Sequence, residues 1–282
     1  MLTTIQRGAG MSQSRILHIT HGDSANERLT DAGIEGERVG WDDPLHHGPI
    51  PAGLNLDELT DVRAKFIAAR GWGEYSTVRF EFQRRNELLA HHAREDEVVI
   101  WSSFELFDQL QLIQLLAWFD NHHLVVNPPS IVWLSGYFSD QPRQELIRWF
   151  EAREPVADEV ITEGSVVWQE IRSPEPDGLR RFTDRSVSSH LPFLQPALRR
   201  FLQEYPGIDD GLSRTQRQVL SILDESPQGP VTLFQLNQER ESPAFMGDWS
   251  FWWELESLCN CPVPPIRVSG GPFVAPPAVA PM

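Results

Sequence analysis

Four short apolar segments, separated by helical patterns, constrain the fold of this chain more than any other feature. The segments predicted as strands are Ile16–Thr20, Glu37–Trp41, Glu97–Trp101 and Ser130–Leu134. Helical patterns follow them at Ser24–Ala32, Leu56–Ala69, Phe80–Ala93 and Asp108–Phe119. Strands that alternate with helices predict a mainly parallel sheet with helices on both faces. We therefore expect a Rossmann-like α/β domain over residues 15–140.

After residue 141 the pattern becomes helical. Helices are predicted at Arg143–Arg153, Glu159–Ile171, Pro192–Glu204 and Ser213–Leu223. We expect residues 141–206 to pack on the α/β domain. Residues 207–268 contain a helix, a Pro/Gly break and a second short helix, which is the rhythm of a winged-helix-like module. The predicted fold class is thus α/β, followed by a helical C-terminal region.

The two ends of the chain have no periodic apolar pattern. Residues 1–14 are predicted to be a disordered extension, in which Met11 is an alternative start to Met1. Residues 269–282 are rich in Pro and are predicted to be a disordered tail.

Composition excludes several protein classes. Hydrophobic residues make up 40% of the chain, with 10 Trp and 15 Phe, so a packed core is expected. No apolar run approaches the roughly 18 to 20 residues of a membrane helix, and the first residues lack the apolar core of a signal peptide. The two cysteines, Cys259 and Cys261, cannot form a disulfide framework. These features predict a cytoplasmic protein without a membrane partner.

The net charge of −16 disfavours binding to nucleic acids, which needs Lys and Arg to neutralise phosphates. From residue 207 to the end, four arginines stand against nine carboxylates, so a DNA-reading surface is not expected there. A small phosphorylated ligand needs only a local pocket and is compatible with this charge.

The first predicted strand ends in a polar turn, His21-Gly22-Asp23-Ser24. A glycine turn that opens a helix at the carboxyl edge of a parallel sheet is a common ligand site. The same residues also fit a purely structural turn, because Ser24 and Glu27 form the S-x-x-E pattern of a capping box. The turn alone does not decide between these two interpretations.

Polar residues also follow the second and third predicted strands. The loop WDDPLHHGPIP starts at Trp41 and carries two aspartates and two histidines, and Glu105 and Asp108 follow the third strand. Since parallel strands end at one edge, six residues are predicted to meet at a common rim: His21, Asp23, Asp43, His46, Glu105 and Asp108. Such a set suits acid–base chemistry or a divalent metal. Alternatively, these residues only stabilise loops.

Roles can be assigned within this rim. Asp23, Asp43 and His46 are the candidate catalytic groups or metal ligands. His21, Gly22, Ser24, Glu105 and Asp108 are candidate ligand-binding residues, and Arg63 or Arg85 could neutralise a phosphate. His18 lies inside a strand and is predicted to be a hydrogen-bonded core histidine. A Ser-His-Asp triad is disfavoured, because the chain has no G-x-S-x-G motif.

The motifs HITHGDSA and WDDPLHHGPIP resemble those of a bacterial family known as domain of unknown function 1835. The matching positions are His18, Gly22, Asp23, Ser24, Trp41, Asp43, Leu45, Gly48, Pro49 and Pro51. Weaker likenesses at VRAKF, IWSSFELFDQLQLIQLL, GLSRTQRQVL and FMGDWSFW extend the resemblance over roughly residues 15 to 268. His21 stands where the family has Asn, and Glu105 where it has Asp. The resemblance implies a fold and the place of a site, but no activity.

Two functions therefore fit the sequence. In the first, the protein binds a small phosphate-bearing or nucleotide-like ligand at the rim, and a hydrolase or transferase reaction is one form this could take. In the second, it is a non-enzymatic regulator or adaptor whose C-terminal module contacts a protein, or less plausibly DNA. In FMGDWSFW, the aromatic residues are predicted to be core anchors, with Asp248 and Ser250 capping a helix.

Overall fold

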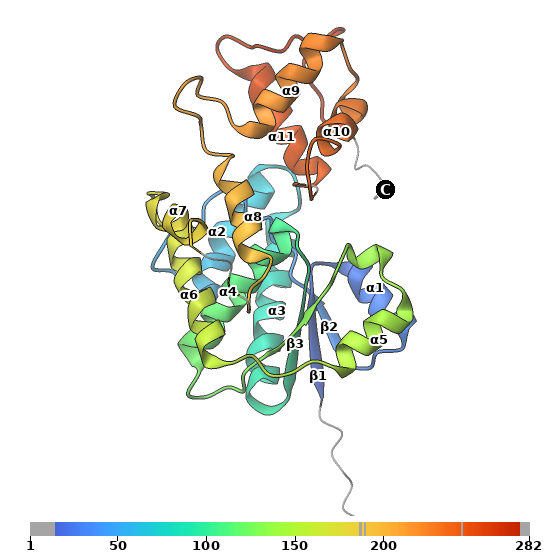
Figure 1. Ribbon diagram of the computed structural model, residues 1–282, viewed down its shortest axis with the longest axis vertical. Coiled ribbons are helices and arrows are strands. Elements are labelled where there is room, and N and C mark those ends of the chain that lie inside the picture. The colour runs from blue at the N-terminus through green and yellow to red at the C-terminus, as the bar shows by residue number, and fades with distance from the viewer. Residues whose placement is uncertain (1–14, 186–187, 189, 244, 277–282) are drawn as a thin grey trace, which may run out of the picture.

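The N-terminal half of the protein is built on a four-stranded sheet in which every neighbouring pair is parallel (Figure 1). The computed structural model describes residues 15–276, except 186, 187, 189 and 244. The strands are β1 (Ile16–Thr20), β2 (Glu37–Gly40), β3 (Glu97–Ser102) and β4 (Ser130–Trp133), in the spatial order β2-β1-β3-β4. The chain thus runs from β1 outward to β2, then crosses back over β1 to β3. The strand order reverses between β1 and β3, which is the switch point of a doubly wound sheet.

Helices make up the rest of the fold. In the α/β part they are α1 (Asp23–Ala32), α2 (Leu56–Ala69), α3 (Tyr75–Glu95), α4 (Leu106–His122), the 3-10 turn η1 (Phe138–Asp140) and α5 (Arg143–Glu151). The C-terminal region contains α6 (Asp158–Ile171), α7 (Asp177–Thr183), α8 (Leu194–Leu202), α9 (Arg214–Glu225), α10 (Pro230–Gln238) and α11 (Asp248–Asn260). The predicted α/β class with a helical C-terminal region is confirmed.

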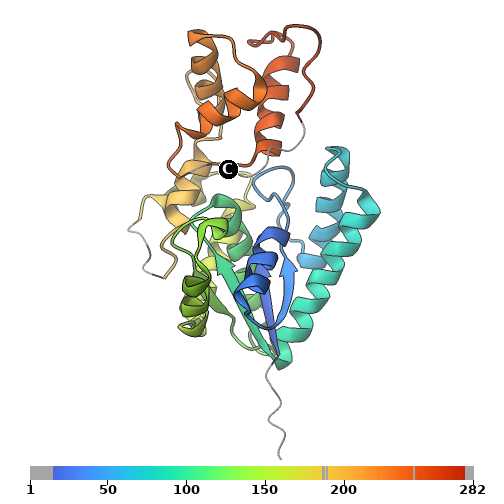
Figure 2. The ribbon, with the colours of Figure 1, turned by 90° about the vertical axis from the view of Figure 1, so that its right-hand side faces the viewer.

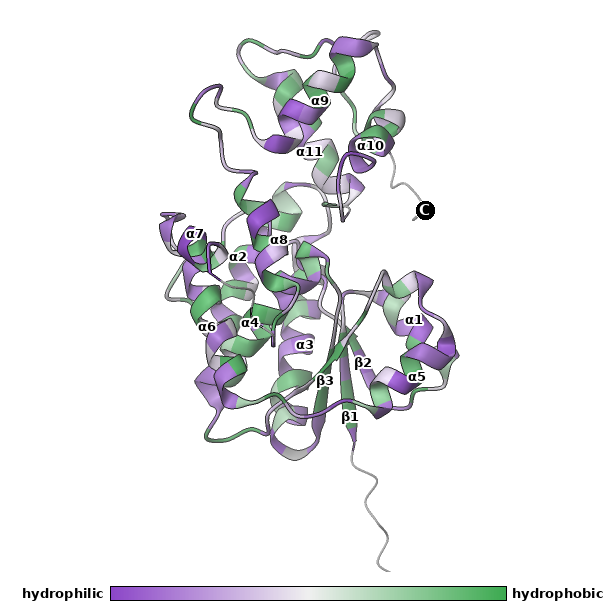
Figure 3. Ribbon diagram, viewed as in Figure 1, coloured by the Kyte–Doolittle hydropathy of each residue, from purple (hydrophilic) through white to green (hydrophobic). Residues whose placement is uncertain are grey.

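Side chains that alternate along the strands pack into two separate hydrophobic cores, one on each face of the sheet. Leu17, Ile19 and Ile100 belong to the larger core, which α2, α3, α4, α6 and α8 cover. Val99 and Trp101 point to the other face, where they pack with α1 and α5. Figure 1 shows α1 and α5 on one side of the sheet and α3 on the other, and in Figure 2 α1 lies in front of the strands. Figure 3 shows β1 and β3 as predominantly hydrophobic.

His18 is a structural residue of the second face, as predicted. It is fully buried, and its Nδ1 accepts a hydrogen bond from the indole N–H of Trp101 at 3.1 Å. Its Nε2–H donates to the carbonyl of Glu35 at 3.0 Å. Burial lowers the pKa of His18 to about 4, so the ring is neutral at neutral pH.

The last three helices form a module with a core of its own, built around Val219, Leu233 and Phe251. Figure 1 shows this module above the carboxyl edge of the sheet. Among the residues that the structure describes from 207 to 276 there are helices but no strand, so the wing hairpin of a winged-helix module is missing from this stretch, and the winged-helix-like interpretation stays a prediction. In the described part of the chain, no helix combines the length and the apolarity needed to cross a membrane.

Two helix starts differ from the sequence prediction. The first residue of α1 is Asp23, the capping position is Gly22, and no side chain caps the helix. Ser24 is exposed, so the predicted capping box with Glu27 is wrong. At α11 the capping position is Gly247, without a side-chain cap. Ser250 does not cap this helix, because its hydroxyl bonds elsewhere.

Candidate functional site

The turns that follow β1 and β2 touch each other at the carboxyl edge of the sheet. Gly22 has a φ angle of 153°, and a Cβ atom there would lie 2.7 Å from the Asp42 carboxylate. A Cβ atom on Gly40 would lie 3.1 Å from the Cα atom of Gly22. Both positions therefore need glycine for the two strand ends to close up. This contact brings Asp42 to the first turn of α1.

His21 and Asp108 meet at the switch point between β1 and β3. The Nδ1 atom of His21 lies 3.3 Å from Oδ1 of Asp108, and Oδ2 of Asp108 accepts the backbone N–H of Ser103 at 2.7 Å. The hydroxyl of Ser103 lies 3.4 Å from the Glu105 carboxylate. Asp108 is buried, whereas His21 and Glu105 are partly exposed. The structure thus brings together three of the predicted rim residues from two different strand ends.

These groups have shifted proton affinities. Burial by itself would lower the pKa of His21, but the hydrogen bond and charge of Asp108, with the charges of Glu105 and Asp42, raise it to about 9. Burial and the Asp108 charge raise the pKa of Glu105 to about 7. Partial withdrawal from water and the neighbouring Asp23 raise the pKa of Asp42 to about 6. At neutral pH the rim therefore holds an imidazolium beside carboxyl groups that can exchange a proton, which suits general acid–base chemistry.

The loop after β2 is held by Arg63 of α2. Its guanidinium donates to Oδ1 of Asp43 from Nε at 2.8 Å, and Nη2 lies 2.8 Å from the same oxygen. The remaining N–H groups reach the carbonyls of Pro44, His47 and Pro49. All five N–H groups of Arg63 are occupied, and the residue is 1% exposed. The prediction that Arg63 neutralises a phosphate is therefore wrong.

Asp43 lies in the interior rather than at the open rim. It is 1% exposed, and its Oδ1 atom is taken by Arg63. Its Oδ2 atom has no hydrogen-bond partner among the described residues and lies 3.8 Å from Nη2 of Arg85. We correct its predicted catalytic role accordingly. A carboxylate in this position anchors the loop, and it is Asp42 that faces the open space.

Arg85 of α3 is buried without hydrogen bonds. It is 3% exposed, and its Nε and Nη1 atoms have no partner among the residues that the structure describes. The rings of Phe82 and Trp41 lie 3.7 and 4.3 Å from its guanidinium carbon. Burial lowers the pKa of Arg85 to about 10, so it stays charged at neutral pH. A buried cation that lacks hydrogen-bond partners is rare in folded proteins, and ligand sites are one place where such groups occur.

His46 connects the loop after β2 to the C-terminal module. Its Nε2 atom lies 2.8 Å from the hydroxyl of Ser250 in α11, and its Nδ1 atom is buried without a partner among the described residues. Burial, with the charges of His47 and Arg63, lowers the pKa of His46 well below its usual range. A neutral His46 that bonds Ser250 docks α11 on the α/β domain. Its predicted catalytic role is not tested by these contacts.

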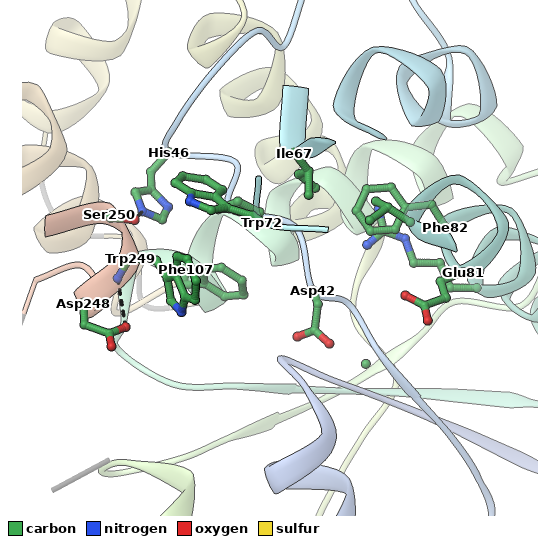
Figure 4. Close-up of a pocket in the computed structure, with 15 residues that line it drawn as sticks. Asp42, His46, Ile67, Trp72, Glu81, Phe82, Phe107, Asp248, Trp249 and Ser250 are labelled. Atoms are coloured by element: carbon green, nitrogen blue, oxygen red, sulfur yellow. Dashed lines mark hydrogen bonds between the residues drawn. The ribbon is translucent and has the colours of Figure 1, made fainter. Parts of the chain in front are cut away.

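A cavity of about 500 Å³ lies between these elements, and its size is typical of small-molecule sites (Figure 4). Its polar lining includes Asp42, His46, Glu81, Arg85, Asp248 and Ser250. Its aromatic lining consists of Trp72, Phe82, Phe107 and Trp249. Figure 4 shows Trp72, Phe107 and Trp249 clustered at one end and Glu81 at the other, with the Asp42 carboxylate between them.

The predicted rim residues are only partly shared with this cavity. His46 and Arg85 line it, while Asp42 takes the place expected for Asp43. His21, Glu105 and Asp108 are not among its lining residues. The charge of Asp42 raises the pKa of His21, so this pair of residues links the cavity to the rim. Asp23 is exposed and contributes its charge to Asp42. Among the residues that the structure describes, no group of three or more His, Cys, Asp or Glu side chains is arranged to hold a metal ion.

Several lining residues could not be recognised from the sequence. Glu81 and Phe82 lie in the middle of α3, where an exposed carboxylate and a buried ring look like ordinary amphipathic positions. The prediction that the aromatic residues of FMGDWSFW are core anchors is wrong for Trp249, which is 46% exposed, whereas Phe251 and Trp252 are buried. Only the docking of α11 on the α/β domain brings Trp249 into the same cavity as Glu81, and no local pattern encodes that docking.

No protein-family model matches the chain, and no curated protein matches it. The resemblance to the family of domain of unknown function 1835 therefore stays a prediction from its motifs.

Proposed function

We propose that this protein binds a small nucleoside-like ligand, with a flat nitrogen-containing ring, in the cavity between the α/β domain and α11. The observation that carries the proposal is the combination of aromatic walls with a buried, unbonded Arg85 in one cavity of about 500 Å³. Aromatic side chains stack on any heteroaromatic ring, and each such contact contributes about 1 to 3 kcal/mol to binding. The position at the carboxyl edge of a parallel sheet is the usual ligand site of this fold class.

The charges of the cavity disfavour a phosphate group on the ligand. Asp42, Glu81 and Asp248 line it, and among its described lining residues Arg85 is the only Lys or Arg. Arg63, the second cation expected for phosphate, is committed to the loop. A like-charged environment of this kind costs binding energy for an anion. The ligand class is therefore narrowed from phosphorylated compounds to neutral, nucleoside-like ones.

The neighbouring rim would allow chemistry on a bound ligand. His21 with Asp108, and Glu105 beside them, supply the proton donors and acceptors that a hydrolase or transferase needs. The first turn of α11 lines the cavity, so this part of the C-terminal module is used by the ligand site. No contact among the described residues favours the regulator hypothesis over ligand binding. Binding is thus the function we propose, and the rim groups define where a reaction would take place.

Tryptophan fluorescence tests the proposal. Purified full-length protein is titrated with adenosine, guanosine, cytidine and uridine, and quenching is expected because Trp72 and Trp249 line the cavity. Trp249→Ala should weaken binding about tenfold, which corresponds to about 1.4 kcal/mol. Phe80→Ala is the matched control, since Phe80 is an exposed aromatic residue of α3 outside the cavity. Absence of binding by all four nucleosides at millimolar concentration would refute the proposal.

A further inference from the structure

The polar end of the cavity restricts which ring can bind. Asp42 and Glu81 are carboxylates, which can only accept hydrogen bonds when they are ionised. Arg85 is a permanent donor with no acceptor capacity. A ring that satisfies both carboxylates and Arg85 must carry N–H donors at two neighbouring ring positions, one for each carboxylate, and an acceptor beside them.

Two exposed carboxylates would accept hydrogen bonds from the N–H groups of the ligand. Asp42 projects from the end of β2 and Glu81 from α3, and both line the cavity. Figure 4 shows their carboxylates facing the same space. Each carboxylate has two acceptor oxygens, so a ring with a single N–H group would leave part of this acceptor set unused.

Arg85 would donate hydrogen bonds to the acceptor atoms of the ligand. Two rings cover its guanidinium, with Phe82 at 3.7 Å and Trp41 at 4.3 Å from the guanidinium carbon. Stacked guanidinium groups donate from their edges, and Arg85 makes no hydrogen bond with the described residues, only the 3.8 Å contact with Asp43. The Nε and Nη1 atoms of Arg85 are buried, so a ligand acceptor reaches the guanidinium only when the side chains around it move. Such an acceptor would then satisfy donors that are costly to leave without partners.

We infer that the cavity selects a 2-amino-6-oxopurine, the ring of guanine, over other nucleobases; this inference rests on the function proposed above. Guanine carries two adjacent N–H donor groups, at N1 and at the 2-amino position, for the carboxylates. It also carries the O6 and N7 acceptors, which are the usual partners of arginine. Adenine has only its 6-amino donor and lacks the O6 acceptor. The aromatic residues Trp72, Phe107 and Trp249 would contact the face of the ring.

Calorimetric titration of the full chain with guanosine, inosine and adenosine tests the inference. Guanosine should bind at least about tenfold more tightly than adenosine, because a site built for hydrogen bonds rejects a ring that leaves them unmade. Inosine lacks the 2-amino group and should fall between the two. Asp42→Asn and Glu81→Gln should reduce the preference for guanosine about tenfold or more. Both residues are exposed, so these variants are expected to fold.

Glu87→Gln is the matched control, since Glu87 is an exposed glutamate of the same helix that does not line the cavity. It should keep the full preference. If adenosine binds as tightly as guanosine, or if Asp42→Asn and Glu81→Gln leave the preference unchanged, the inference is overturned while the proposed function stands. If none of the three nucleosides binds, both fail.

Discussion

His21 lies at the switch point of the sheet, and its pKa is set by a partner from another strand end. Its partner Asp108 comes from another strand end, 87 residues away in the numbering, and the two side chains meet at 3.3 Å. The position of both could be predicted, since parallel strands end at one edge. The proton affinity of His21 could not, because it depends on which atoms approach one another.

The first prediction concerns this pair. Wild-type His21 should titrate with a pKa near 9. Since this value lies above the ordinary 6.5, the pair stabilises the fold fully below pH 6.5, and its contribution is lost as the pH rises through 9. Asp108→Asn should bring the His21 pKa to 6.5 or lower, because burial then dominates, and should reduce the free energy of unfolding at pH 6 by roughly 2 to 3 kcal/mol.

Histidine ring NMR spectra recorded against pH, and urea unfolding at pH 6 and pH 10, measure both quantities. Asp31→Asn, on an exposed aspartate of α1, is the control and should leave the His21 titration unchanged. A His21 pKa that stays near 9 in Asp108→Asn would contradict the assignment of Asp108 as its partner.

The residue types of Arg63 and Asp43 did not reveal their roles. An aspartate and an arginine near a predicted rim looked like ligand groups, but they bind each other and the carbonyls of their own loop. The sequence gives the identity of both partners without showing that they pair. Their pairing is a tertiary contact between the loop after β2 and α2.

The second prediction follows from the five occupied N–H groups of Arg63. Arg63→Lys keeps the charge but offers one nitrogen in place of three, so the loop carbonyls and Asp43 lose partners in a buried site. The free energy of unfolding should fall by about 3 kcal/mol, measured by urea denaturation. Lys65→Arg, at an exposed position of the same helix, should change it by less than about 0.5 kcal/mol. An equal, small effect of both variants would show that Arg63 does not hold the loop.

At the scale of elements, strands were predicted better than helix ends. β1 and α2 have the predicted bounds, and β2, β3 and β4 differ by one residue at one end. α3 begins at Tyr75, five residues before the predicted start at Phe80. α7 and η1 were not predicted, since segments of this length hold too few residues to show a period.

α11 is the element whose docking completes the cavity. His46 bonds Ser250, and Arg70 bonds Glu256 at 2.6 Å while it lies 4.5 Å from the ring of Trp253. His47 packs on the same ring, with a centroid distance of 4.6 Å. The interface thus combines two neutral histidines with one ion pair, and its strength should depend on pH.

The third prediction concerns this dependence. Burial, with the charges of Arg63 and Arg70, lowers the pKa of His47 to about 4, and that of His46 is lowered as well. Because the folded values lie below 6.5, the unfolded chain binds more protons, so stability falls as the pH drops from 6.5 toward 4. Hydrogen exchange of α11 should therefore be faster at pH 5 than at pH 7, after correction for intrinsic rates.

Ser250→Ala should accelerate the exchange of α11 at pH 7 as well, since it leaves the buried Nε2 atom of His46 without a partner. The expected cost is about 1 to 3 kcal/mol. Ser257→Ala, at the exposed far end of the same helix, is the control and should leave exchange unchanged. Equal protection of α11 in both variants would show that the Ser250–His46 bond does not hold the module.

At the scale of the whole molecule, the cavity exists because distant parts of the chain meet. The turn after β2, the first half of α3 and the first turn of α11 supply most of its lining, and Ile67, Trp72 and Phe107 complete it. The α/β class, and the edge at which a site lies, could be predicted from the order of strands and helices. The cavity could not, since it depends on how the C-terminal helices settle on that edge.

Hydrogen exchange of the full chain with and without guanosine tests most directly whether a ligand binds between the sheet edge and α11, because it reports on every segment that lines the cavity. We expect increased protection at residues 40–46, 78–85 and 247–250 together, with little change in α9 and α10. Protection limited to α9 and α10, or no change at a guanosine concentration that saturates binding, would contradict a ligand site between the sheet edge and α11.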